Sequence, residues 1–165
     1  PMLRSLVGSE MCIRDRLSVS LAVADATAKS LNLPLYKYLG GSKTFKMPVP
    51  MLNVINGGAH ANNNLTFQEF MIIPINEQTF GNCLRKSSEV FHTLKQILEK
   101  KGLSTAVGDE GGFSPNLKNE EDACKLIKEA ILKSGYKLGK DFMLGLDVAA
   151  SEFYKNRKYK LESKI

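Results

Sequence analysis

The sequence predicts an α/β architecture. Two segments with apolar residues at helical spacing lie between short apolar runs that are typical of strands. The last of these runs, FMLGLDV at residues 142–148, is almost continuous in apolar residues and carries one carboxylate, Asp147, near its end. This pattern is typical of a strand that is buried on both faces. Catalytic groups of α/β barrels lie at the C-terminal ends of strands, and the position of Asp147 fits that rule.

The composition is that of an ordinary globular protein and argues against several functions. Hydrophobic residues make up 43% of the 165 positions, but no run of about 20 apolar residues could span a membrane. The net charge of +6 is dispersed, and Glu152 and Glu162 dilute the densest basic run, at residues 155–164, which disfavours a nucleic-acid partner. The three cysteines are odd in number and far apart, which predicts reduced thiols in a cytoplasmic protein.

The first third of the chain predicts helices and a linker. Residues 17–31 (LSVSLAVADATAKSL) are rich in Ala and Leu and contain no Gly or Pro, which predicts a buried helix. Pro34 interrupts this pattern, and the polar residues 42–46 are expected to link two domains. Residues 1–16 show neither helical nor strand periodicity, and we expect them to be an assembly or cloning artefact outside the fold.

Two strands and a loop are expected next. Residues 47–55 (MPVPMLNVI) predict a strand that opens with prolines. Asn56 and the two glycines after it form a turn signal, and residues 59–64 (AHANNN) form a polar loop. A second apolar run follows at residues 70–75.

Two amphipathic helices follow these strands. Apolar residues recur at helical spacing from Phe80 to Leu98, and Gly102 is a suitable C-terminal cap. Asn119 is a good N-cap for a second helix because three acidic residues follow it in the first turn. Gly135 is expected to end that helix.

Polar residues in two loops could carry chemistry. The segment VGDEGGFSPN at residues 107–116 holds Asp109 and Glu110 between glycines, which allow unusual backbone conformations that could aim an acid into a site. A solvated acidic turn explains the same pattern equally well. His60 lies between glycines and asparagines, so the loop could close over an anion, or His60 could be a surface residue.

Two further carboxylates lie beside apolar runs. Gln68 and Glu69 precede the second run, and Asp147 lies near the end of the last one. A carboxylate beside a buried strand is costly unless it is paired, hydrogen-bonded or bound to a metal. Asp147 is a reasonable Mg²⁺ ligand, and both carboxylates could instead be satisfied structural groups.

Four long motifs together resemble an enolase of bacterial type over residues 17–165. They are GGAHANN (57–63), QEFMIIP (68–74), VGDEGGFSPN (107–116) and GLDVAASEF (145–153), which occur in the order and approximate spacing of that family. The resemblance implies that residues 17–46 are the last helices of an N-terminal α+β capping domain. It implies that residues 47–165 are the first part of the catalytic β/α barrel.

The resemblance also implies an activity. Enolases reversibly dehydrate 2-phosphoglycerate to phosphoenolpyruvate, with Mg²⁺ ions and a lysine base. Glu110 matches the acid that acts on the leaving hydroxyl, and Glu69 matches a second carboxylate that assists it. Gln68 is expected to contribute a hydrogen bond, and His60 matches a histidine on a loop that closes over the substrate.

Metal ligands and partners follow from the same resemblance. It implies that Asp147 binds the first Mg²⁺ and that Ala59 contributes to the second metal through its backbone. It also implies a small-molecule substrate, a homodimer for the full-length family member and a cytoplasmic location.

The length of the barrel segment leaves an alternative open. Residues 47–165 are about half of a barrel of roughly 250 residues. The base lysine, the other metal ligands and the phosphate anchors are not assigned to this chain, so we expect the fragment alone to be inactive. The alternative is a non-catalytic truncated product that lacks the base lysine. A racemase of the same barrel superfamily is disfavoured by the motifs GGAHANN and VGDEGGF.

Overall fold

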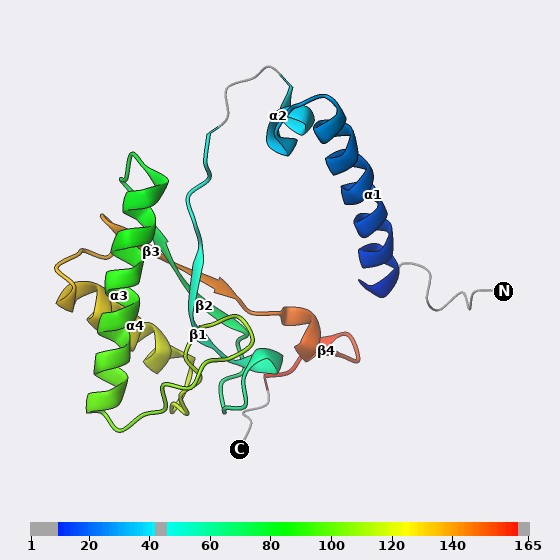
Figure 1. Ribbon diagram of the computed structural model, residues 1–165. Helices are drawn as coiled ribbons and strands as arrows, with labels where there is room; N and C mark the ends of the chain where they lie inside the picture. Colours follow the sequence, from blue (N-terminus) through cyan, green and yellow to red (C-terminus); the bar gives the residue numbers. More distant parts are fainter. Residues whose placement is uncertain (1–9, 42–45, 162–165) are drawn as a thin grey trace. The chain divides into compact units, whose positions relative to one another are not determined.

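The computed structural model describes residues 10–41 and 46–161, without the side chains of residues 10–14 (Figure 1). Residues 1–9, most of the expected artefact, lie outside the described residues. Contacts within the chain divide it into two units, with the boundary between Lys46 and Met47. Each unit is described by itself.

The first unit contains helices α1 (Glu10–Ser30) and α2 (Leu35–Gly40). Pro34 precedes α2 as its N-cap, where its lack of an N–H costs nothing. Residues 10–16, which show no periodicity in the sequence, lie in α1. This stretch contains no Gly or Pro and continues directly into the Ala-rich segment, so nothing in it stops a helix.

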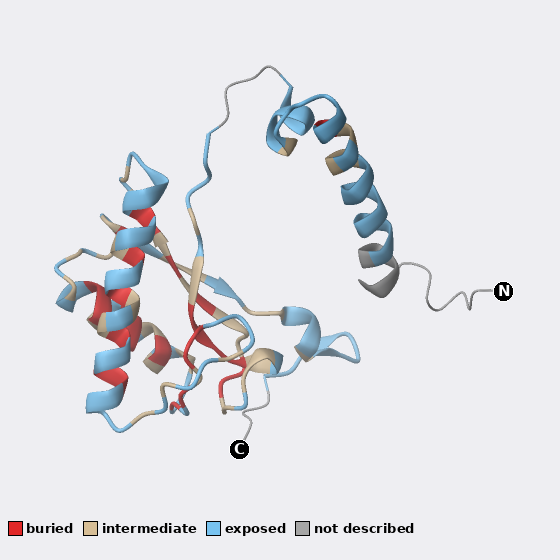
Figure 2. Cartoon of the chain, viewed as in Figure 1, coloured by how far each residue is buried: buried red, intermediate tan, exposed pale blue. Residues whose placement is uncertain are grey.

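Helix α1 is exposed, which contradicts its predicted burial (Figure 2). Four apolar residues in its described part, Leu17, Val19, Leu21 and Val23, are all exposed, with 65% for Val19. Residues two apart point to different sides of a helix, so these four form no single stripe that one neighbour could cover. Among the side chains of α1 that the structure describes, Ala28 is the buried one, near the end that continues into α2.

The second unit is a three-stranded sheet with two helices on one face (Figure 1). Strands β1 (Leu52–Asn56), β2 (Glu69–Pro74) and β3 (Phe142–Asp147) lie in the order β1-β2-β3, and both pairs are antiparallel. Helices α3 (Phe80–Lys100) and α4 (Glu120–Lys133) pack on the face that carries Phe70 and Ile72. The described residues thus mix helices and strands but form no closed barrel.

Two 3-10 helices and a hairpin complete the second unit. The 3-10 helix η3 (Ala150–Phe153) follows β3 and leads into a hairpin of β4 (Tyr154–Lys155) and β5 (Lys158–Tyr159). A second 3-10 helix, η2 (Gly58–His60), follows β1. The sequence did not predict the hairpin, because the basic residues of this segment leave no clear alternation of apolar and polar residues.

Two strand predictions need correction. Strand β1 begins at Leu52 rather than at Met47, because Pro48 and Pro50 have no N–H to give to a sheet. Strand β3 is not buried on both faces, since Met143 and Leu146 are each 47% exposed. It lies at the edge of the sheet, and the two helices cover only one face.

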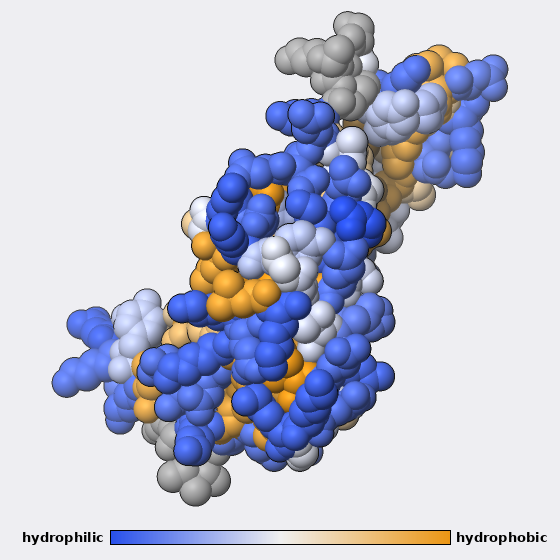
Figure 3. Space-filling model, turned by 90° about the vertical axis from the view of Figure 1, so that its left-hand side faces the viewer, coloured by the Kyte–Doolittle hydropathy of each residue, from blue (hydrophilic) through white to orange (hydrophobic). Residues whose placement is uncertain are grey.

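The core lies between the helices and the sheet. Val90 and Leu94 of α3, Ile127 and Ile131 of α4, and Phe70 of β2 have at most 1% exposure. The outer surface that Figure 3 displays is mostly hydrophilic, and its apolar areas form separate patches. In the described part of the chain no helix is long and apolar enough to cross a bilayer.

The predicted ends of α3 and α4 are confirmed. The Asp122 N–H donates to Asn119 Oδ1 at 3.0 Å, which caps the start of α4. Gly102 and Gly135 follow the two helices with φ angles of 67° and 84°, the left-handed conformation that glycine adopts most easily.

Two neighbouring residues of α4 provide a matched test of this packing. Ile131 has no solvent exposure, whereas Leu132 is 53% exposed. We expect Ile131→Ala to lower the free energy of unfolding by about 2–5 kcal/mol, because it removes buried methyl groups and leaves a cavity. Leu132→Ala should change it by no more than about 0.5 kcal/mol. Urea unfolding of the whole chain measures both, and equal losses would contradict the assigned face of α4.

Candidate functional site

The register of the sheet brings carboxylates from two strands to one edge. Asn56 pairs with Glu69, and Glu69 pairs with Asp147, so the three residues form a row across the sheet. Because the strands are antiparallel, this row joins the ends of β1 and β3 to the start of β2. Directly opposite like charges disfavour the pairing of two strands, which makes this row unusual for a structural edge.

The loop after β1 is held against the sheet by its backbone. The Gly57 N–H donates to the Gln68 carbonyl at 2.9 Å, and the Gly58 N–H donates to the Leu65 carbonyl at 3.0 Å. A Cβ on Gly57 would lie 2.3 Å from the Phe67 carbonyl oxygen, so only glycine fits there. These contacts fix the start of η2, which carries Ala59 and His60.

The acidic loop is joined to both β1 and the histidine loop. Phe113 exchanges backbone hydrogen bonds with β1: its N–H donates to Val54 and its carbonyl accepts from Asn56, both at 2.9 Å. The Asp109 N–H donates to the His60 carbonyl at 3.0 Å. The two loops are therefore placed relative to each other by main-chain contacts.

This arrangement brings three of the predicted side chains together. His60 Nδ1 lies 3.0 Å from Glu110 Oε1, with 29% and 35% of the two side-chain surfaces exposed. His60, Glu69 and Glu110 each offer a ligand atom within 4.8 Å of the others, so the group could hold a cation or share protons. Asp109, next to Glu110, is exposed and lies outside this group.

Glu69 is the group whose acidity the site changes. Its half-buried position raises its pKa above the ordinary 4.5, and a hydrogen bond with Glu110 and the charges of Glu110 and Asp147 raise the pKa further. Gln68 acts in the opposite direction through a hydrogen bond. Such a carboxyl group keeps its proton at a higher pH than a free one, which is the property of a proton donor.

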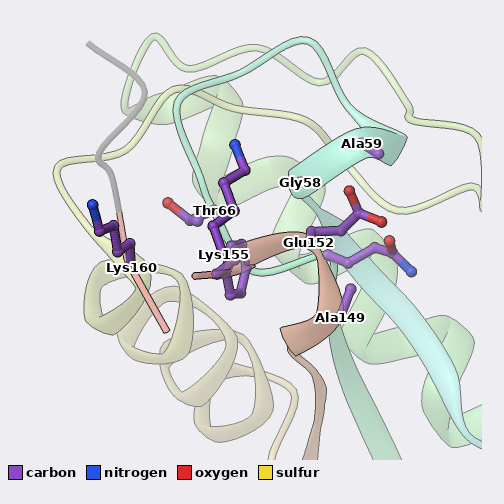
Figure 4. A pocket seen from close by; sticks show the side chains of 9 residues that line it. Gly58, Ala59, Thr66, Ala149, Glu152, Lys155 and Lys160 are labelled. Atoms are coloured by element: carbon purple, nitrogen blue, oxygen red, sulfur yellow. The ribbon is translucent and has the colours of Figure 1, made fainter. Parts of the chain in front are cut away.

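The other predicted residues lie around this group. Asp147 is exposed, stands outside the group of three and accepts a hydrogen bond from the Ala149 N–H at 2.9 Å. Ala59 and Gln68 line a pocket of about 270 Å³ (Figure 4). Its other lining residues are Gly58, Thr66, Ala149, Glu152, Phe153, Lys155 and Lys160. The pocket therefore lies between η2 on one side and η3 with the hairpin on the other.

Sequence reasoning missed two asparagines of β1. Asn53 Nδ2 donates to Glu110 Oε2 at 2.9 Å. Asn56 has no solvent exposure and lies against Gly108 and Gly112, where a Cβ would come within 3 Å of its side chain. The sequence LNVIN could have indicated them, because it places two amide side chains within one apolar strand. A buried amide is costly unless it is hydrogen-bonded.

Comparison with known proteins places these features in a class. A family model described as "Enolase, C-terminal TIM barrel domain" matches residues 44–165, so the second unit is part of an α/β barrel domain. The chain is 61% identical over 144 residues to "Enolase" of Ehrlichia ruminantium strain Welgevonden, and 60% identical to that of strain Gardel. Each match covers 87% of this chain. The chain belongs to the enolase family. It spans 34% of the length of these curated relatives.

The raised pKa of Glu69 predicts a pH-dependent stability. Ionisation of Glu69 costs more in the folded than in the unfolded chain, so stability is lost as the pH rises from 4.5 through the raised value. Glu69→Gln removes this loss. Its free energy of unfolding relative to the parent chain should therefore increase from about pH 4 to about pH 7 in urea titrations. Glu110→Gln should weaken the pH dependence of stability, because it removes one cause of the raised pKa of Glu69. If the parent chain and Glu69→Gln show parallel curves of stability against pH, the prediction is wrong.

The tight turn at Gly57 predicts a second change in stability. Gly57→Ala should lower the free energy of unfolding by about 1–3 kcal/mol, because the new Cβ meets backbone and must displace the loop. Gly81→Ala is the control, since a Cβ there meets nothing within 4 Å and Gly81 lies in α3. It should raise stability by about 0.5–1 kcal/mol. Thermal unfolding compares the two, and a neutral Gly57→Ala would contradict the observed turn.

Proposed function

We propose that this chain forms part of the active site of a lyase that reversibly dehydrates 2-phosphoglycerate to phosphoenolpyruvate. The observation that carries the proposal is the meeting of His60, Glu69 and Glu110 beside Asp147, at the edge where β1, β2 and β3 come together. These are the residues that the resemblance to enolases assigns to catalysis, substrate binding and metal binding. Membership of the family supports the proposal.

The chemistry requires a proton donor for a poor leaving group. Hydroxide leaves slowly unless an acid protonates it as it departs. In our proposal Glu110 is that acid, and Glu69 assists as a second carboxyl group whose raised pKa keeps a proton within reach. His60 and Gln68 bind the substrate from two sides of these acids. His60 already contacts Glu110, so a substrate bound to His60 would lie close to the acid.

The chain also offers ligands for Mg²⁺. Asp147 is exposed, and among the described residues no basic side chain forms an ion pair with its carboxylate, whose oxygens are ligands that Mg²⁺ prefers. We propose Asp147 as a ligand of the first ion and the exposed backbone at Ala59 as a contact of the second. When bound, Mg²⁺ would offset the negative charge that builds up on the substrate carboxylate.

The complete reaction needs groups that we assign to the rest of a full-length enzyme. No lysine of this chain is assigned as the base, and the chain spans about a third of its curated relatives. The second candidate is therefore a non-catalytic product. For the full-length protein we propose a homodimer and a cytoplasmic location, because the resemblance to the family implies both.

A chimera tests the proposal. The matched segment of the Ehrlichia ruminantium enolase is replaced by the aligned 144 residues of this chain, and phosphoenolpyruvate formation is measured with Mg²⁺. We expect the chimera to be active and the 165-residue chain to be inactive. In the chimera, Glu110→Gln should lower kcat by about 10²–10⁴-fold, the usual contribution of general acid catalysis.

Two further variants provide the controls. Glu121→Gln changes an exposed carboxylate on α4 and should leave kcat unchanged. Asp147→Asn should raise the Mg²⁺ concentration needed for half-maximal activity. A folded chimera without activity, or one in which Glu110→Gln has no effect, would refute the proposed function and favour the non-catalytic product.

A further inference from the structure

We infer that Asn53 is a positioning residue that holds the carboxylate of Glu110 in its working orientation. The inference rests on the proposed function, because it assigns a task to a neighbour of the proposed acid. Asn53 lies in the middle of β1 and comes from a part of the sequence far from the acidic loop.

The contacts of Glu110 carry the inference. Asn53 Nδ2 lies 2.9 Å from Oε2 of Glu110, and His60 Nδ1 lies 3.0 Å from Oε1. The Asn53 amide therefore donates a hydrogen bond to Oε2, whereas His60 Nδ1 lies near Oε1 without the geometry of a hydrogen bond. The hydrogen bond from Asn53 fixes the direction in which Oε2 points, and the imidazole beside Oε1 limits the rotation of the carboxylate.

The two neighbours of the carboxylate, Asn53 and His60, differ in how firmly their backbones are held. Asn53 pairs in register with Met71 of β2, so its backbone is part of the sheet. His60 belongs to the three-residue helix η2 within a loop, and Glu110 itself lies in a loop without helix or strand. Asn53 therefore orients Glu110 from a residue of the sheet. Sites supported by strands hold their geometry more precisely than sites supported by loops alone.

The type of side chain also fits the task. Asn53 Nδ2 donates to Glu110 while its Oδ1 is buried without a hydrogen-bond partner among the described residues. The amide thus keeps this orientation although half of its hydrogen-bonding capacity is unused. A neutral donor orients the carboxylate without a positive charge beside an acid that must take up and release a proton. A lysine or arginine at this place would favour the ionised form.

Kinetics of the chimera test the inference. Asn53→Leu removes the donor at similar volume, and Asn53→Asp replaces the donor with an acceptor at equal size. Both should lower kcat by about 10–100-fold with less than about a threefold change in KM, because a misplaced group affects the chemical step. Leu52→Ala is the control, because it weakens the same strand without touching Glu110, and it should lower stability without this loss of kcat.

A spectroscopic measurement on the 165-residue chain gives an answer that does not depend on activity. One side-chain amide proton of Asn53 should resonate downfield and exchange slowly with solvent. Glu110→Ala should abolish both features, and Glu121→Ala should not.

The outcomes separate the two claims. An active chimera whose Asn53 variants keep full kcat overturns the role of Asn53 and leaves the proposed function standing. An inactive parent chimera refutes the proposed function, and the amide signal then decides the inference by itself. If Glu110→Ala changes neither the chemical shift nor the exchange rate of the Asn53 amide proton, the inference is wrong in either case.

Discussion

The backbone pairing of Phe113 with the end of β1 is the constraint on which the site depends. The hydrogen bonds between Phe113 and both Val54 and Asn56 attach the acidic loop to the sheet as if it were a short additional strand. Phe113 is 2% exposed, and its ring stacks on Phe91 of α3 with centroids 4.4 Å apart. The loop that carries Glu110 is therefore anchored in the hydrophobic core, so the packing of α3 also sets the position of the acid.

This anchor restricts the residues around it. A Cβ on Gly112 would lie 2.3 Å from Asn56 Oδ1, so the loop can approach β1 only as glycine. Within the part of the chain that the structure describes, Asn56 has no hydrogen bond for either of its side-chain polar atoms, an arrangement that costs stability. The unpaired amide of Asn56 and the raised pKa of Glu69 both disfavour the folded state at this end of the sheet. Perturbed acids and unpaired polar atoms gathered in one place are typical of a functional site.

The sequence predicted the elements whose signals are local. Helices α3 and α4 follow from apolar spacing and from caps such as Asn119, because both lie on one core. Burial was less predictable, because it depends on neighbours that periodicity does not reveal. Leu17, Val19, Leu21 and Val23 of α1 are exposed, and β3 is an edge strand. His60, Glu69 and Glu110 were singled out through family motifs, and their spacing alone left other readings open. Asn53 was missed because its partner is 57 positions away.

The antiparallel register explains why acids from different strand ends can act together. In a parallel sheet, all strands start at the same end of the sheet. A residue at the start of one strand therefore lies far from a residue at the end of the neighbouring strand. Here β2 runs against β3, so Glu69 at its start faces Asp147 at the end of β3. The same reversal leads the chain from β1 through the histidine loop and directly back into β2. One edge therefore collects His60, Glu69 and Asp147, and the Phe113 anchor adds Glu110 to them.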